Sequence, residues 1–479
     1  MNEADVLQPG ELILDGKYRV EAQLGKGAFA RVYRVLHLKL QQMRAVKVIT
    51  PDTPGVGSTV LSDYRSRFEQ EAQLGSKLES CSNVVRVYDF EESAGRLCLM
   101  LEYMAGGSLG DRLRQYTEQG ALMPVEEAVR LTLQAAVGLV SLHGLRAVHR
   151  DIKPSNILLD EAGNAKIADL GLAQTAADTS RRSALGSLAP DQPGTPQYMS
   201  PEQAGSRDML YPTSDVYSLG CVLFELLTGK VWRQEMPYIR EVRDLRPEVP
   251  EDVAVVLGRM LRQTPGRSAA ETDDPSRRYV TMEAVQAALA GVQQGLAQRV
   301  RWADLYRRGQ EALARRQWPA AVESLQALLE QAGEYEDAAV LLEQAQAGLA
   351  EADRETAVAG LVAQAEKALE KEAWPELERV VAELRPLSID AAAPFEGKLR
   401  EEQERQQQEQ RRREAAEQQE QRRRQLADWY HQAEQMATSD PQGALVLLTR
   451  VRQEDADYPG LAELQRRAQA RLAEQRRGM

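Results

Sequence analysis

The sequence predicts an α+β domain followed by an all-α region. Up to about residue 295, short runs with the composition of β-strands, such as YRVEAQL, ARVYRVLHL, AVKVI and RLCLMLEYM, alternate with helical stretches. Beyond that point nearly every segment is rich in Ala, Leu, Gln, Glu and Arg. Strands followed by helices favour an α+β domain, and the uninterrupted helical composition favours a separate all-α region.

Length and charge limit the number of domains and the classes of partner. With 479 residues, and roughly 100–200 residues in a typical domain, the chain has room for roughly two to four domains. The net charge of −12 argues against general binding to nucleic acid or anionic membranes, because phosphate-rich partners attract basic surfaces. We therefore expect no nucleic-acid partner.

The cysteines and the apolar segments indicate the compartment. Cys81, Cys98 and Cys221 are scattered, have no metal-ligand spacing and cannot all pair in disulfides. The first residues lack the apolar core of a signal peptide, and no stretch approaches the roughly 20 apolar residues that span a bilayer. These features predict a cytoplasmic location and no membrane insertion.

The helical region contains internal repeats. Two pairs of segments resemble one another: 305–329 with 361–384, and 335–352 with 458–475. In the first pair Gly309 aligns with Ala365, and Trp318 aligns with Trp374. These helix pairs resemble degenerate tetratricopeptide-type repeats, which implies units that stack and hold a protein partner. A helical bundle without a binding role is the alternative, because the spacing is irregular and exceeds the usual repeat of about 34 residues.

Residues 401–425 consist almost entirely of Glu, Gln and Arg. A coiled coil needs apolar residues at its a and d positions, and this segment lacks them. We therefore interpret the segment as a solvated helical spacer, with a dimerising helix as the less favoured alternative.

A glycine-containing segment, LGKGAFARVY at 24–33, lies between two strand-like runs. Gly25 and Gly27 leave room for backbone N–H groups to approach phosphates, while Ala30 stands where such loops usually have a third glycine. By itself this segment predicts a nucleotide-binding loop no more strongly than it predicts a plain hairpin.

A lysine and a glutamate in apolar surroundings form the next candidate pair. Lys47 lies in the strand-like run AVKVI, where an unpaired ammonium is costly. On the helix predicted over 67–78, Glu71 lies on the apolar face and Glu69 on the opposite one. Lys47 and Glu71 can neutralise one another, and the lysine can then hold phosphates. A purely structural ion pair is the alternative.

The segments VHRDIKPSNILLD (148–160) and KIADLGLA (166–173) follow in order. With them, roughly residues 15–290 resemble the eukaryotic-like protein kinase family, of bacterial type. The resemblance implies a two-lobed α+β protein kinase fold with ATP between the lobes. The expected organisation is an N-terminal extension (1–16), a catalytic domain (17–292) with lobes 17–103 and 104–292, helical repeat units (293–352, 353–400 and 426–479) and the spacer (401–425).

The resemblance assigns roles to four polar residues. Asp151 would accept the proton of a substrate hydroxyl, and Lys153 would neutralise charge on the γ-phosphate. Asn156 and Asp169 would hold Mg²⁺, or Mn²⁺, since hard cations prefer oxygen ligands. Leu170 replaces the commoner Phe of the metal motif and can fill the same apolar space.

The resemblance also places ATP. A gatekeeper position falls on Leu101, and the residues that follow it would bind adenine through their backbone. The expected ATP-binding residues are Leu24, Gly25, Gly27, Val32, Ala45, Lys47, Glu102, Met104 and Leu158. Ordinary core is the alternative for the apolar residues among them.

The segment GTPQYMSPEQ (194–203) and the KPSN run are similar to those of serine/threonine kinases. Thr195 would contact Asp151 and Lys153. Three further residues are expected in structural roles. Glu202 would pair with Arg278, and Asp215 would brace the catalytic loop.

Arg150 precedes Asp151 and can bind a phosphorylated activation segment. The candidate phosphorylation sites are Thr175, Thr179, Ser180, Ser183 and Ser187. The sequence therefore predicts an activated serine/threonine kinase that acts on proteins. A pseudokinase scaffold is the alternative, and an adaptor based on the repeats is compatible with the kinase.

Overall fold

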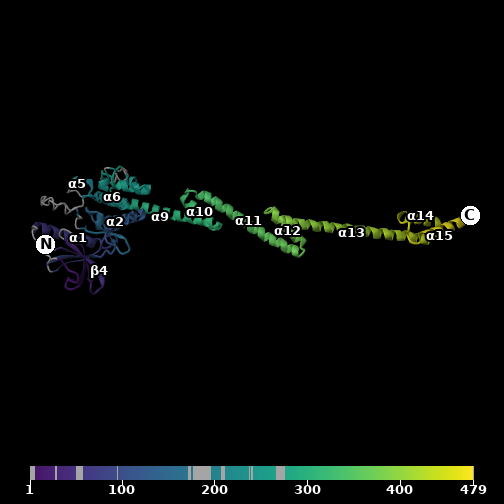
Figure 1. The fold of residues 1–479 in the computed structure, drawn as a ribbon, viewed down its shortest axis with the longest axis horizontal. Helices are drawn as coiled ribbons and strands as arrows, with labels where there is room; N and C mark the ends of the chain where they lie inside the picture. The colour runs from purple at the N-terminus through teal and green to yellow at the C-terminus, as the bar shows by residue number, and fades with distance from the viewer. Residues whose placement is uncertain are drawn as a thin grey trace. The chain divides into compact units, whose positions relative to one another are not determined.

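The computed structural model describes residues 6–26, 30–49, 58–93, 95–170, 174–175, 196–205, 211–236, 238, 241–265, 274 and 276–477, with backbone alone at 58–64, 174–175 and 204–205. The chain divides into two units, Met1–Asp304 and Leu305–Met479. The division falls inside the range 293–352 that the sequence assigned to the first repeat unit. Figure 1 shows unit 1 in purple to teal and unit 2 in green to yellow.

Unit 1 begins with an antiparallel six-stranded sheet of order β1-β2-β3-β4-β6-β5. Its strands are β1 (Leu12–Ile13), β2 (Tyr18–Lys26), β3 (Ala30–His37), β4 (Gln42–Ile49), β5 (Val87–Ser93) and β6 (Arg96–Glu102). Helix α1 (Ser58–Lys77) packs against β5 and β6. Alternation of apolar and polar residues gives the sheet a buried face, and its register places Val32 opposite Lys47.

The described part of the expected N-terminal extension is packed onto this sheet. Strand β1 pairs with β2, and the amide of Leu7 lies 3.3 Å from the hydroxyl oxygen of Tyr33. Leu7 and Leu14 are buried in the same apolar cluster as Tyr33 and Val46. Burying these leucines stabilises the sheet by removing apolar surface from water.

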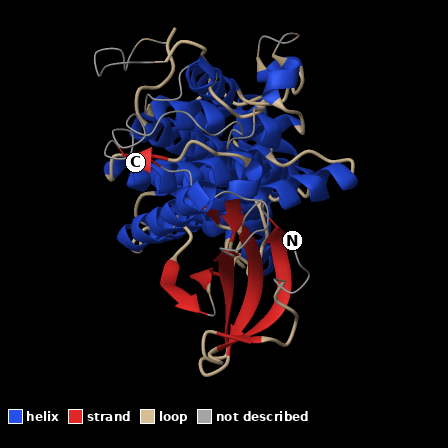
Figure 2. Ribbon diagram, turned by 90° about the vertical axis from the view of Figure 1, so that its left-hand side faces the viewer, coloured by secondary structure: helices blue, strands red, loops and turns tan. Residues whose placement is uncertain are grey.

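The remainder of unit 1 is mainly helical (Figure 2). It contains α2 (Leu109–Glu118), α3 (Val125–Gly144), α5 (Pro201–Gly205), α6 (Pro212–Thr228), α7 (Trp232–Glu235), α8 (Glu251–Met260), short strands β7 (Ala147–Val148), β8 (Ile157–Leu159), β9 (Ala165–Ile167) and β10 (Gln174–Thr175), and 3₁₀ turns η2 (Pro154–Asn156) and η4 (Val242–Asp244). Helix α9 (Met282–Ala314) begins in unit 1, and its residues from Leu305 onward belong to unit 2. Helices α3 and α6 pack together at the centre of the largest apolar cluster. Almost every residue of α6 is buried, so this helix is a fixed support for the loops around it.

Unit 2 is built from long and short helices in turn. They are α10 (Trp318–Ala332), α11 (Ala338–Glu370), α12 (Trp374–Leu384), α13 (Ile389–Met436), α14 (Pro441–Glu454) and α15 (Leu461–Arg477). Three separate apolar clusters form, around Ala321, Leu377 and Leu448. Helix α11 contributes to the first two clusters, and α13 contributes to the second and third.

This arrangement differs from the direct stacking expected from the sequence. Helix α11 has 33 residues and α13 has 48, which correspond to about 50 Å and about 72 Å at 1.5 Å per residue. Each is longer than the helix that packs on it, so one end serves one cluster and the other end serves the next. Neighbouring modules of unit 2 therefore share a helix.

The aligned tryptophans have equivalent surroundings. Trp318 and Trp374 each begin a short helix and are each followed by proline. Two residues earlier, Arg316 and Glu372 have positive φ values of 56° and 53°. The recurring left-handed residue ends the preceding helix in both modules, so the sequence similarity corresponds to a common turn.

The second pair of similar segments also shares a contact. The rings of Tyr306 and Tyr335 lie 5.5 Å apart, and those of Tyr430 and Tyr458 lie 5.2 Å apart. In each case a tyrosine just before the third helix of a module packs on one in the first helix. These contacts support structural repetition in unit 2.

Candidate active site

Lys47, Glu71 and Asp169 meet between the sheet and the helical part of unit 1. The Nζ atom of Lys47, on β4, lies 2.6 Å from Oε2 of Glu71, on α1. The same Nζ lies 2.9 Å from Oδ1 of Asp169, which follows β9. The Glu71 side chain is only 5% exposed, whereas that of Asp169 is 47% exposed. The ammonium is therefore held by one buried carboxylate and one that remains open to a ligand.

Burial and charge act in opposite directions on these groups. Burial alone lowers the pKa of Lys47, but the carboxylates of Glu71 and Asp169 outweigh it and raise that pKa above 10.5. Burial raises the pKa of Glu71 despite the attraction of Lys47. The charge of Lys47 lowers the pKa of Asp169, which stays ionised at neutral pH. The site therefore presents a permanent cation beside an ionised carboxylate.

Asp151 is held by two neighbours in the loop between β7 and β8. The Nζ atom of Lys153 lies 2.7 Å from its Oδ2. The Nδ2 atom of Asn156 donates to the same Oδ2 at 3.0 Å and to the backbone carbonyl of Asp151 at 2.8 Å. Asp151 and Asn156 are both buried. These contacts fix the direction of the carboxylate that would receive a proton.

Asp215 braces the same loop from the buried helix α6. Its Oδ2 accepts the backbone N–H of His149 at 2.8 Å, and its Oδ1 accepts that of Arg150 at 2.9 Å. His143, which was not among the residues expected from the sequence, also contacts Asp215: its Nε2 lies 2.8 Å from Oδ2. Its position at the last turn of α3, just before β7, is the signal that could have revealed it.

Asn156 and Asp169 have the oxygen donors that a divalent-cation site needs. Because Nδ2 of Asn156 donates to Asp151, Oδ1 is the atom that this amide can offer to a cation. Asp169 supplies a partly exposed carboxylate, in a left-handed backbone conformation with φ of 62°. Mg²⁺ is commonly bound by one or two protein oxygens together with substrate phosphates, which agrees with this donor set.

The residue after Asp169 is fixed in the core. Leu170 is buried within the largest apolar cluster, as expected for an apolar residue in place of Phe. The backbone of Leu170 lies close enough to the carboxylate of Glu71 to lower its pKa, so α1 approaches the segment that carries Asp169.

The residues expected around ATP lie on the sheet, on β8 and in the segment that follows β6. Gly25 pairs with Val32 across β2 and β3, and a Cβ added to Gly25 would meet no atom of the described residues within 4 Å. Ala45 pairs with Leu101 on β6. Leu158 lies on β8, and Leu24 is largely exposed. Among the residues that the structure describes, none fills the space beside Gly25.

A backbone hydrogen bond joins the segment after β6 to β8 in the helical part of unit 1. Met104 is buried, and the amide of Gly106 donates to the carbonyl of Leu159 at 2.9 Å. Both carboxylate oxygens of Glu102 lie within 2.9 Å of Nζ of Lys166. This ion pair joins β6 to β9 and was not expected, because the sequence predicted only a backbone role for Glu102.

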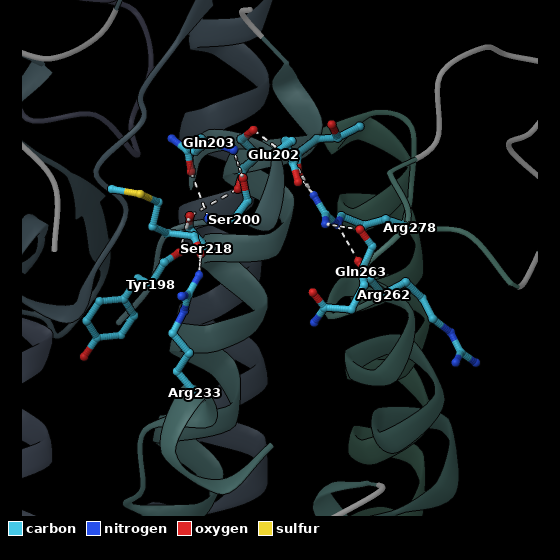
Figure 3. Close-up of polar contacts among 12 residues, drawn as sticks. Tyr198, Ser200, Glu202, Gln203, Ser218, Arg233, Arg262, Gln263 and Arg278 are labelled. Carbon is cyan, nitrogen blue, oxygen red and sulfur yellow. Dashed lines mark hydrogen bonds and ion pairs between the residues drawn. The ribbon is translucent and has the colours of Figure 1, made fainter. Parts of the chain in front are cut away.

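The expected ion pair between Arg278 and Glu202 forms beside α6. Arg278 is fully buried, and its Nη1 lies 2.5 Å from Oε1 of Glu202 (Figure 3). The same guanidinium donates to the carbonyls of Thr213 and Arg262, both at 2.9 Å. Its charge is therefore matched by a carboxylate and by backbone oxygens.

Some of the expected site residues lie outside the described part of the chain, and one has only its backbone described. Thr175 belongs to β10, whose backbone pairs with β7, but its side chain is not described. The residues outside the described part of the chain are Gly27, Thr179, Ser180, Ser183, Ser187 and Thr195.

Comparisons with known proteins agree with this geometry. The family model for the protein kinase domain matches residues 18–256. The serine/threonine-protein kinase PknL of Mycobacterium tuberculosis is 33% identical over 301 residues, which cover 62% of this chain and 71% of PknL. The chain belongs to the protein kinase family. It is of the serine/threonine class, as are the relatives named here.

Other relatives of this kinase are considerably longer than the matched part. PrkC of Bacillus subtilis is 31% identical over 291 residues, which cover 57% of this chain but only 40% of PrkC. Pkn3 of Myxococcus xanthus is 36% identical over 222 residues, which cover 44% of this chain and 38% of Pkn3.

Within the described residues, no helix combines the length and apolarity that crossing a membrane requires.

Proposed function

We propose that this protein transfers the γ-phosphate of ATP to serine and threonine hydroxyls of protein substrates. The observation that carries the proposal is the position of Lys47, whose Nζ lies 2.6 Å from Glu71 and 2.9 Å from Asp169. A cation held between a buried and an open carboxylate is suited to bind phosphate oxygens beside a metal. The adenine would lie between the sheet and Leu158, near Met104.

The residues of the catalytic loop perform the remaining steps. Asp151 orients the acceptor hydroxyl and receives its proton, with Asn156 and Lys153 fixing the carboxylate. Lys153 also neutralises charge that develops on the transferred phosphate. Asn156 and Asp169 would hold Mg²⁺, with Mn²⁺ as a possible substitute, and the bound ion supplies electrostatic stabilisation of the phosphates.

We also propose that the kinase phosphorylates its own activation segment, within 174–195, and that the phosphate contacts Arg150.

Unit 2 would bind a protein partner through tetratricopeptide-like modules. The support for repeated modules is the shared turn before Trp318 and Trp374. The three free cysteines accord with a cytoplasmic location.

The experiment is transfer of labelled phosphate from Mg-ATP by the full chain to itself and to dephosphorylated casein, with peptide mapping of the label. Asp169→Ala tests the metal ligand, and Asp89→Ala is the control because Asp89 is exposed on β5. We expect Ser or Thr labelling by wild type and by the control, and its loss in Asp169→Ala. Equal labelling by all three proteins, or none by wild type with either Mg²⁺ or Mn²⁺, would contradict the proposal.

A further inference from the structure

Ser200 and Gln203 form a reciprocal pair of hydrogen bonds at the start of α5. The backbone N–H of Ser200 donates to Oε1 of Gln203 at 3.0 Å, and the backbone N–H of Gln203 lies 3.3 Å from Oγ of Ser200. This is the capping box that the spacing Ser-Pro-Glu-Gln permits. Ser200 is fully buried, so its hydroxyl needs such a partner. The serine that stands in place of the family's usual alanine thus has a structural purpose.

The side chain of Gln203 makes one more contact, with the catalytic loop. Its Nε2 donates to the backbone carbonyl of Arg150 at 3.3 Å. The orientation of the amide follows from chemistry, because the Arg150 carbonyl can only accept and the Ser200 N–H can only donate. Among uncharged side chains of this length, only glutamine supplies both an acceptor and a donor here.

The bonded carbonyl belongs to the peptide that joins Arg150 to Asp151. Arg150 has a positive φ of 71°, and its own N–H is held by Asp215 at 2.9 Å. A non-glycine residue in this left-handed conformation is strained and persists where the surrounding structure holds it. Asp215 and Gln203 hold the two sides of Arg150, and thereby the backbone that leads to Asp151.

The loop on the other side of Gln203 is itself fixed. The carbonyl of Tyr198 accepts the hydroxyl of Ser218 at 2.8 Å, and that of Met199 accepts Nη2 of Arg233 at 2.6 Å (Figure 3). With the Ser200 capping box, three consecutive residues are held by side chains of α5, α6 and α7. Gln203 therefore joins an anchored loop to the residue before Asp151.

We propose that Gln203 is a positioning residue for Asp151 and couples the 198–200 loop to the catalytic loop. The inference rests on the proposed function, because it assigns Asp151 the role of receiving the substrate proton. A displacement of about 1 Å at a reacting group can cost about a hundredfold in rate. Loss of the Gln203 bond should therefore lower turnover without weakening ATP binding at Lys47.

The decisive variant is Gln203→Glu in the full chain. A carboxylate still accepts the Ser200 N–H and keeps the capping box, but it cannot donate to the Arg150 carbonyl. Gln203→Ala removes both contacts without adding charge, and Ser200→Ala removes only the serine hydroxyl from the box. Gln115→Glu, on the exposed surface of α2, is the control for the added charge.

We expect both Gln203 variants to lower kcat at least about tenfold with unchanged KM for Mg-ATP. Ser200→Ala and Gln115→Glu should retain most of the activity. Hydrogen–deuterium exchange should be several-fold faster at 149–156 in the Gln203 variants, with an unchanged unfolding midpoint for Gln203→Glu.

Wild-type kcat and wild-type exchange in Gln203→Glu would overturn the inference. A reduced kcat with unaltered exchange at 149–156 would also overturn it, because the effect would then bypass the catalytic loop. If wild type transfers no phosphate, the proposed function fails, and the exchange measurement alone decides whether Gln203 holds the loop.

Discussion

Glu71 Oε2 lies 2.6 Å from Lys47 Nζ, and the Glu71 side chain is only 5% exposed. Glu71→Gln should lower kcat/KM about tenfold to a hundredfold, because Lys47 would lose the charge that fixes its ammonium beside Asp169. Steady-state kinetics with Mg-ATP measure the effect. Glu69→Gln is the matched control, since Glu69 is 44% exposed and pairs with Arg65. Equal losses in the two variants would contradict a specific role for Glu71.

Asp215 provides a prediction with a defined pH dependence. Burial alone would raise the pKa of Asp215, but hydrogen bonds from His143 and from the backbone of Arg150 hold it below 3.8. Because the folded-state pKa is the lower one, the stabilisation by ionised Asp215 is complete above the unfolded value and is lost as pH falls through the folded value. Asp215→Asn should cost about 3 kcal/mol at pH 7.

The measurement is urea unfolding read by hydrogen exchange of α6, at pH 7 and at several pH values below 4. The difference between wild type and Asp215→Asn should be constant near neutrality and shrink in acid. A difference that stays the same across the acidic range would show that the carboxylate charge is unimportant.

The buried pair of Arg278 and Glu202 predicts strong coupling. Arg278→Met should destabilise unit 1 by about 3–5 kcal/mol, since it leaves the buried charge of Glu202 without its cation and removes the Arg278 hydrogen bonds to two backbone carbonyls. Glu202→Gln should cost less, and the double variant should cost little more than Arg278→Met. Urea unfolding of the four proteins forms the cycle. Strictly additive effects would argue against the pair.

Two glycines of α11 should respond oppositely to alanine. A Cβ on Gly348 would lie 2.7 Å from the ring of Trp318, whereas a Cβ on Gly360 would meet no atom within 4 Å in the described part of the chain. Gly348→Ala should destabilise the packing of α10 on α11 by about 1–3 kcal/mol through overpacking. Gly360→Ala should stabilise the helix by about 1 kcal/mol. Hydrogen exchange of α10 and α11 measures both effects, and a stabilising Gly348→Ala would disprove the close packing.

Much of the active site could be anticipated from local sequence. Helical periodicity alone distinguished Glu71 from Glu69, because burial of one helix face follows from a repeat of 3.6 residues. The motif order around Asp151 and Asp169 indicated the family. The spacing from Trp318 to Trp374 revealed a repeated turn. These features depend on neighbours within one or two elements, and sequence records such neighbours directly.

Only the tertiary structure decided the contacts between elements that are distant in the sequence. The bond from Gln203 to Arg150, the pair of Glu102 with Lys166, and the packing of Gly348 on Trp318 join segments with no common periodicity. The sharing of α11 and α13 between modules was likewise missed, because composition shows that a segment is helical but does not show which cluster each end joins. Such contacts arise from how whole elements pack, and packing is fixed by the combined shape of many side chains.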